Sequence, residues 1–229
     1  MSDTRPKHIL ILMLAIPAVL CAQPQRETRG GALMSFSAEK QLIRNLDLNF
    51  EEELRLATTP NVYDRTVSTL GIDYSLMNKK LKIGAYYAFI YLYNNDFLYE
   101  PRHRFYVNLS YRQKLDQLTL SWRIRLQETL RDDNRGSYRV NPRYVMKNKL
   151  EAEYAIFGKP WKPFISCDFS TNLNDDETRY DLVRLRTQAG ANWRINRTTS
   201  MDFYLRYDEY LKADDPRTIS VGVAYKMRF

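Results

Sequence analysis

Cysteine, histidine and glycine are scarce in this chain, and each shortage excludes a class of protein. The 229 residues contain two Cys, two His and eight Gly. Because Cys21 lies in the N-terminal segment, removal of that segment would leave Cys167 without a partner for an intramolecular disulfide. Zinc sites built from Cys and His clusters, glycine-rich phosphate loops and glycine-rich low-complexity tracts are also excluded. No apolar run approaches the ~18 residues of a transmembrane helix.

A short basic head followed by the non-polar run Ile9–Leu20 opens the chain. Such a run has the length of the apolar part of a secretory signal and is too short to span a bilayer. We therefore expect residues 1–22 to be a signal peptide and residues 23–229 to be the mature barrel domain. A lipoprotein anchored through Cys21 is the alternative, although Cys21 follows a leucine rather than the usual small residue.

Apolar and polar side chains alternate with a period of two through most of the mature chain, which predicts strands with one apolar and one polar face. Within residues 118–131, Trp122 and Ile124 share one face. Arg123 and Arg125 share the other. The abundant aromatic residues, 17 Tyr and 10 Phe, also favour strands. The expected strands are Gly31–Lys40, Leu46–Ala57, Tyr63–Leu76, Leu81–Tyr93, His103–Gln113, Leu118–Arg131, Pro142–Ile156, Phe164–Asn174, Val183–Ile195, Met201–Tyr207 and Ile219–Phe229.

Short connections alternate along the chain with longer ones that are mostly rich in Asn, Asp, Pro and Arg. Outer-membrane barrels have this arrangement, with short periplasmic turns and longer outer loops. The expected fold is all-β, an up-and-down antiparallel transmembrane β-barrel of about 10–12 strands. Single-chain bacterial barrels have an even number of strands. Either ten strands starting at Leu46 close the wall, or residues 23–30 add a short twelfth strand to the candidates above.

Three features favour lipid rather than water around the barrel. The strands run to about 11–14 residues, whereas soluble strands usually have ~5–6 and a tilted membrane strand needs ~9–11. The chain ends on Phe229 with Tyr225 and Met227 in phase, which resembles the assembly signal of outer-membrane barrels. Aromatic residues lie on the apolar face near strand ends, as interfacial girdles require: Tyr91, Tyr93, Tyr111, Trp193 and Tyr207. A soluble periplasmic lipid-binding barrel, with the apolar face buried around a ligand, is the alternative.

The chain also resembles a family of small Gram-negative outer-membrane β-barrels that is catalogued only as a domain of unknown function. The resemblance spans nearly the whole mature chain and implies location in the outer membrane of a Gram-negative bacterium. It implies no catalytic or binding residues. Four strand segments carry it: EEELRL (51–56), LKIGAYYAFIYL (81–92), YEPRHRFYVNLSYR (99–112) and LSWRIRLQ (120–127).

In this register, many charged side chains point into the lumen, with Arg and Lys in excess over Asp and Glu. Lys147 and Asp208 share this face. Because a barrel of ~10 strands is narrow and unpaired buried charges are costly, we expect ion pairs that plug the lumen. A narrow, porin-like, anion-preferring channel is the alternative. The expected lumen-lining charge network comprises Glu51, Glu53, Arg55, Arg65, Arg104, Arg112, Arg123, Arg125, Glu151, Glu153, Asp168, Arg184, Arg186 and Arg206.

Candidate catalytic chemistry is sparse, so we expect no enzyme activity, no metal and no cofactor. His103 is the one histidine of the mature chain. Its place in the strand alternation puts it on the lipid-facing side. No serine lies two residues further on, as an outer-membrane hydrolase would need. Nucleic acid is not an expected partner, because basic residues that point inward cannot form an external stripe. The expected partners are outer-membrane lipid, the barrel-assembly machinery and an unidentified protein. Solvated turns explain the loop acids Asp132, Asp133, Asp175, Asp176 and Glu177 better than a divalent-cation site does.

Overall fold

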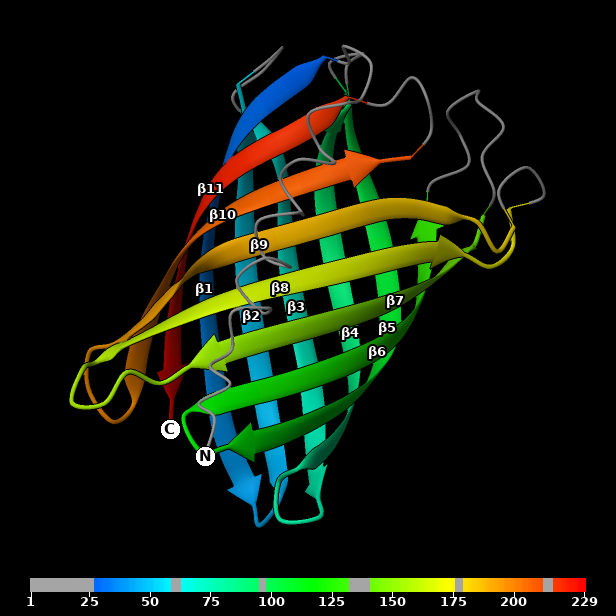
Figure 1. Cartoon of the computed structure of the whole chain (residues 1–229). Coiled ribbons are helices and arrows are strands. Elements are labelled where there is room, and N and C mark those ends of the chain that lie inside the picture. The colour runs from blue at the N-terminus through cyan, green and yellow to red at the C-terminus, as the bar shows by residue number, and fades with distance from the viewer. Residues whose placement is uncertain (1–26, 59–62, 95–97, 132–140, 176–178, 212–215) are drawn as a thin grey trace, which may run out of the picture.

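The computed structural model describes residues 27–58, 63–94, 98–131, 141–175, 179–211 and 216–229, and strands make up most of them. Figure 1 shows the strands wrapped into one barrel wall. No helix in these ranges is long and apolar enough to cross a membrane. The strands are β1 (Thr28–Ile43), β2 (Leu46–Ala57), β3 (Tyr63–Leu76), β4 (Leu81–Asn94), β5 (Leu98–Leu115), β6 (Leu118–Arg131), β7 (Arg143–Tyr154), β8 (Trp161–Asn172), β9 (Leu182–Arg194), β10 (Thr199–Tyr210) and β11 (Arg217–Arg228).

The sheet closes through a pair of strands that run in the same direction. Every strand pairs antiparallel with its sequence neighbour, and β1 then pairs with β11 in parallel, from Thr28 opposite Arg217 to Glu39 opposite Arg228. The all-β barrel of ten to twelve strands is confirmed. The expected even number and all-antiparallel wall are wrong at this seam. With strands alternating in direction, the first and the eleventh must be parallel neighbours.

The wall has polar side chains inside and apolar side chains outside. Leu70 on β3, Val107 on β5 and Val221 on β11 are at least half exposed on the outer face. Asp73 and Asp202, from β3 and β10, are buried in the interior, at 6% and 8% exposure. This distribution is the reverse of a soluble core, and it follows from alternate strand residues pointing to opposite faces.

The two ends of the barrel differ. Short turns join β1 to β2 and β5 to β6, with Asn45 and Asp116 at positive φ, as tight hairpins require. The short turns and the C-terminus lie toward the lower end in Figure 1, and the strand ends that lead into the longer connections lie at the opposite end. Aromatic pairs stack on the outer face near both ends. Trp161 and Trp193 have ring centroids 5.3 Å apart beside the short turns. Tyr91 stacks on a tyrosine of β5 at 4.8 Å near the long connections.

Candidate functional site in the barrel lumen

Two adjoining cavities of about 460 and 430 Å³ occupy the lumen and share Glu51, Arg112 and Lys226 in their linings. The turn at residues 196–199 borders the first cavity, and the second extends along the middle of the strands. Exposure falls away from the short-turn end: the Lys226 side chain is 48% exposed, whereas that of Arg206 is 8% exposed. The first cavity therefore reaches the short-turn end of the lumen, where Lys226 is half exposed.

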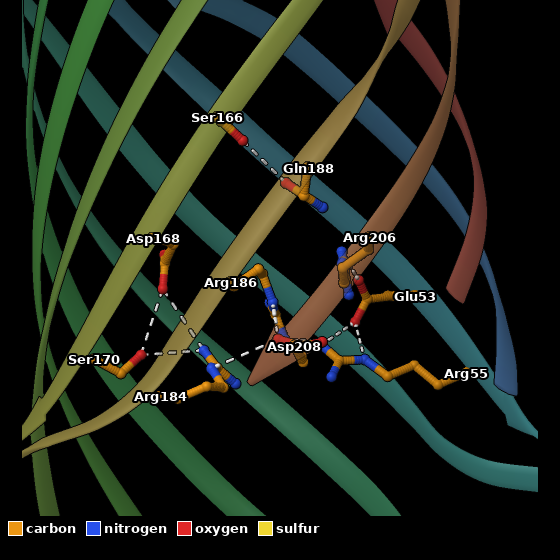
Figure 2. A network of polar contacts seen from close by, with 10 residues as sticks. All are labelled: Glu53, Arg55, Ser166, Asp168, Ser170, Arg184, Arg186, Gln188, Arg206 and Asp208. Atoms are coloured by element: carbon orange, nitrogen blue, oxygen red, sulfur yellow. Dashed lines mark hydrogen bonds and ion pairs between the residues drawn. The ribbon is translucent and has the colours of Figure 1, made fainter. Parts of the chain in front are cut away.

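A dense group of ion pairs on β8, β9 and β10 borders the second cavity, whose lining includes Asp168 and Arg186 (Figure 2). Arg186 donates from Nε and Nη2 to the two carboxylate oxygens of Asp208, at 2.6 and 3.2 Å. Arg184 lies 3.7 Å from Asp168 and 3.8 Å from Asp208. It also donates to the hydroxyl of Ser170 at 3.2 Å. Asp208 therefore holds two guanidinium groups while it is only 5% exposed.

The same network reaches across the barrel seam to β2. Arg206 of β10 lies 3.8 Å from Glu53 of β2, although β11 and β1 separate the two strands in the wall. Glu53 also accepts from Arg55 at 2.6 Å. With its amide oxygen turned toward Arg206, Gln188 accepts from that guanidinium at 2.9 and 3.1 Å. These contacts span the lumen between β10 and β2 (Figure 2).

The remaining expected lumen residues divide into paired and unpaired groups. Arg65, Glu151 and Glu153 are paired with Asp64 at 2.9 Å, Lys149 at 2.6 Å and Lys162 at 3.2 Å, respectively. Glu51 borders both cavities and has no ion pair among the residues that the structure describes. The same holds for a group of cations on β5, β6 and β7: Arg104, Arg112, Arg123, Arg125 and Lys147.

A tyrosine stack, which the sequence pattern does not predict, lines the wall beside these cations. Tyr86 of β4 stacks on Tyr106 of β5 at 4.8 Å, and the Arg125 guanidinium covers the Tyr106 ring at 3.9 Å. The Tyr86 hydroxyl donates to Asp73 at 2.6 Å. Gly71 makes room for this ring, since a Cβ there would lie 2.0 Å from it. The signal that could have identified the stack is Tyr86 sharing its strand face with small residues such as Gly84.

The chain matches a known protein family over most of its length. A family model described as "Protein of unknown function (DUF2490)" matches residues 30–217. The chain belongs to the DUF2490 family. The resemblance found in the strand segments is thereby confirmed. Among solved structures, the DUF2490 chain is similar to the β-domain of the Bordetella autotransporter BrkA, with 12% identity, a TM-score of 0.41 and coverage of 82% of this chain and 86% of that one. No curated protein matches the chain.

The other expected functional positions of this DUF2490 chain lie away from the cavities. His103 is on the outer face, where its Nδ1 lies 2.7 Å from the Tyr87 hydroxyl. The described ranges contain no group of His, Cys, Asp or Glu that could hold a metal ion. Of the five loop acids, Asp175 is described. Asp132, Asp133, Asp176 and Glu177 lie outside the described residues, as do the expected signal peptide at residues 1–22 and Cys21.

The C-terminal strand carries Tyr225, Met227 and Phe229 beside the parallel seam. Tyr225 stacks on Phe36 of β1 at 6.0 Å. The Phe229 backbone N–H donates to the carbonyl of Glu39 at 2.8 Å, and the Phe229 side chain is 65% exposed. These contacts make the chain terminus part of barrel closure. Its role as an assembly signal stays a prediction.

Proposed function

We propose that this DUF2490 chain is an integral outer-membrane barrel, exported with a signal peptide and embedded in lipid through its outer face. The reversed distribution of apolar and polar side chains carries the proposal. On a folded protein, a contiguous exposed apolar patch larger than a few hundred Å² marks a surface that contacts a membrane or another protein. Here apolar side chains such as Phe105, Leu126 and Val221 cover the outer face around the wall. Aromatic stacks near both ends fit the two bilayer interfaces.

Membrane fractionation tests this proposal. The mature protein is expected to stay with outer membranes after carbonate and high-salt washing, because its contact with lipid is apolar and insensitive to salt. A soluble periplasmic protein from the same cells is the control that both washes should release. Release of the barrel as a soluble monomer would contradict membrane insertion. The soluble lipid-binding alternative needs an apolar interior, whereas charged and polar side chains dominate the cavity linings.

We further propose that the lumen is closed and that the barrel acts as a structural element or an interaction scaffold. Eleven strands spaced ~4.8 Å apart and tilted by ~40° give a backbone diameter of about 22 Å, which long side chains from opposite walls largely fill. The contact between Arg206 and Glu53 crosses this space, and Asp208 with its two arginines fills the region beside it. A non-catalytic role agrees with the position of His103, the one histidine among the described residues, on the outer face.

Planar-bilayer recording distinguishes the closed lumen from a channel. The purified wild-type protein is expected to give no current, because the cross-lumen ion pairs block the path through the lumen. A general porin inserted under the same conditions is the positive control. A small, stable, anion-preferring current would favour the channel alternative, which the unpaired cations Arg104, Arg123 and Arg125 support. A large, weakly selective current would contradict both versions.

A further inference from the structure

The wall formed by β5, β6 and β7 has more positive charge than its own carboxylates neutralise. Arg125 lies directly opposite Lys147 in the β6·β7 register, and Arg123 lies opposite Lys149. All four line the 430 Å³ cavity, together with Arg104. Like charges on directly paired strand positions destabilise a sheet. Lys149 is paired with Glu151, so the Arg125–Lys147 pair is the one that is unfavourable unless an anion lies between the two groups.

The carboxylates that border the same cavity are almost all engaged elsewhere. Glu53 is held by Arg55, Glu151 by Lys149 and Asp168 by Arg184. Asp202 is held by Lys226 at 2.5 Å, and Glu153 by Lys162 at 3.2 Å. Glu51 is the one cavity carboxylate among the described residues without an ion pair. It faces Arg123 and Arg125 and interacts with them electrostatically. One carboxylate cannot neutralise the whole cationic group.

Neutral groups fix two of these cations in place. Arg125 donates to the Asn108 side-chain oxygen at 2.8 Å while it covers the Tyr106 ring. Arg104 donates to the Thr129 hydroxyl at 3.2 Å. Lys147 makes no hydrogen bond or ion pair among the described residues, and the cations that act on it most strongly are Arg184, Arg104 and Arg125. Cations oriented in this way keep their charge available to a ligand.

We propose that this cavity binds a small phosphate-type anion between Arg104, Arg123, Arg125 and Lys147. Guanidinium groups match phosphate oxygens with paired hydrogen bonds, and an ammonium adds a compact point charge. A phosphate group offers three strong acceptor oxygens, which suits donors converging from three strands better than a single carboxylate does. The cavity volume of about 430 Å³ lies within the range of small-ligand pockets and leaves room for a pyrophosphate or a small phosphate ester.

The closed wall indicates whether this anion comes from water or from the lipid bilayer. Every neighbouring pair of strands is hydrogen-bonded around the barrel, so the described strands offer no lateral opening to a lipid headgroup. The first cavity reaches the short-turn end, where Lys226 and Arg228 line it, and it adjoins the second cavity. The ligand is therefore a water-soluble anion. This route of entry rests on the closed lumen proposed above, whereas binding itself does not.

Calorimetric titration of pyrophosphate into the mature protein in detergent at low ionic strength tests the site. The wild type should bind saturably with one site, and Arg125→Gln combined with Lys147→Gln should weaken binding about tenfold or more, as loss of charge-assisted hydrogen bonds predicts. Lys162→Gln is the matched control. It removes the same charge from a lumen lysine that is already paired with Glu153, so its affinity should stay within about threefold of the wild type.

Thermal unfolding keeps the proposal testable if the double variant does not fold. Lys147→Gln alone removes a partnerless charge, so it should raise the melting temperature without ligand, and pyrophosphate should then stabilise it less than the wild type. No saturable binding by the wild type would overturn the proposal, as would an equal loss in Lys162→Gln. Competition by phosphatidylglycerol micelles would also overturn it, because the anion would then be a lipid headgroup. Calorimetry and thermal unfolding do not depend on conduction through the barrel. A current in the bilayer experiment would therefore contradict the closed lumen, whereas absent pyrophosphate binding would contradict the anion site.

Discussion

Replacing Asp208 with alanine should lower the free energy of unfolding by about 3–5 kcal/mol, the range for breaking one partner out of a buried ion pair. Asp208 accepts two hydrogen bonds from Arg186 and lies 3.8 Å from Arg184. Without it, two guanidinium groups would remain in a region that excludes water. In our proposal, Asp208 and its neighbours close the lumen. The Asp208→Ala variant should therefore also conduct more current than the wild type in planar bilayers. Urea unfolding in lipid vesicles measures the stability.

Glu39→Ala is the matched control for this change. Glu39 pairs with Arg228 at 2.9 Å, but the Arg228 side chain is 69% exposed. Loss of such a surface pair should cost less than about 1 kcal/mol. If Asp208→Ala destabilises the barrel no more than Glu39→Ala does, the network does not hold the lumen closed. A double variant, Arg186→Met with Asp208→Leu, should cost less than Asp208→Ala alone, because no buried charge then loses its partner.

Replacing Gly71 with valine should also cost about 3–5 kcal/mol, through overpacking and a lost hydrogen bond to a carboxylate. A Cβ at Gly71 would lie 2.0 Å from the Tyr86 ring, so the ring must move. The movement would remove the Tyr86 hydrogen bond to Asp73 and its stack on Tyr106. The resistance of the folded barrel to heating in detergent, read from its gel mobility, and urea unfolding both report this loss.

Ala85→Val adds similar volume on the outer face of the neighbouring strand and is the control for this effect. Ala85 lies opposite Ile72 and points away from the lumen, so the added methyl groups meet lipid and stability should change by less than about 1 kcal/mol. Adding Tyr86→Ala to Gly71→Val should relieve the clash, so the two changes should not be additive. Wild-type stability in Gly71→Val would show that the glycine is not needed for the tyrosine to fit.

Most strand positions were predictable from alternation. β2, β3 and β6 have the bounds that periodicity predicts. β5 starts earlier than expected, at Leu98, because backbone pairing with β4 continues through Tyr99 and Pro101 after the alternation fades. The alternation is weak in β4 because its inner face, apart from Lys82, carries Tyr86 and small or apolar residues. Hydrogen bonding of the main chain does not depend on side-chain polarity, so a strand can outlast its pattern.

Alternation predicts inward positions for the charged site residues, but it does not predict their partners. Arg186 and Asp208 belong to adjacent strands, and Arg206 meets Glu53 across the seam from a distant part of the sequence. The unpaired group around Arg125 and Lys147 depends on the β6·β7 register, which places the two opposite one another. A shift of register would have given these cations different neighbours.

The sequence by itself determined which side of the wall each residue faces. Successive strand residues point to opposite faces whatever the strand pairs with, so a period of two in polarity is enough to separate lumen from outer face. Only the tertiary structure decided that eleven strands close through the parallel pairing of β1 with β11, which carbonyls and N–H groups meet at that seam, and which lumen cations have a carboxylate beside them. Those outcomes depend on distances between residues far apart in the chain, and such distances exist only after the sheet has closed.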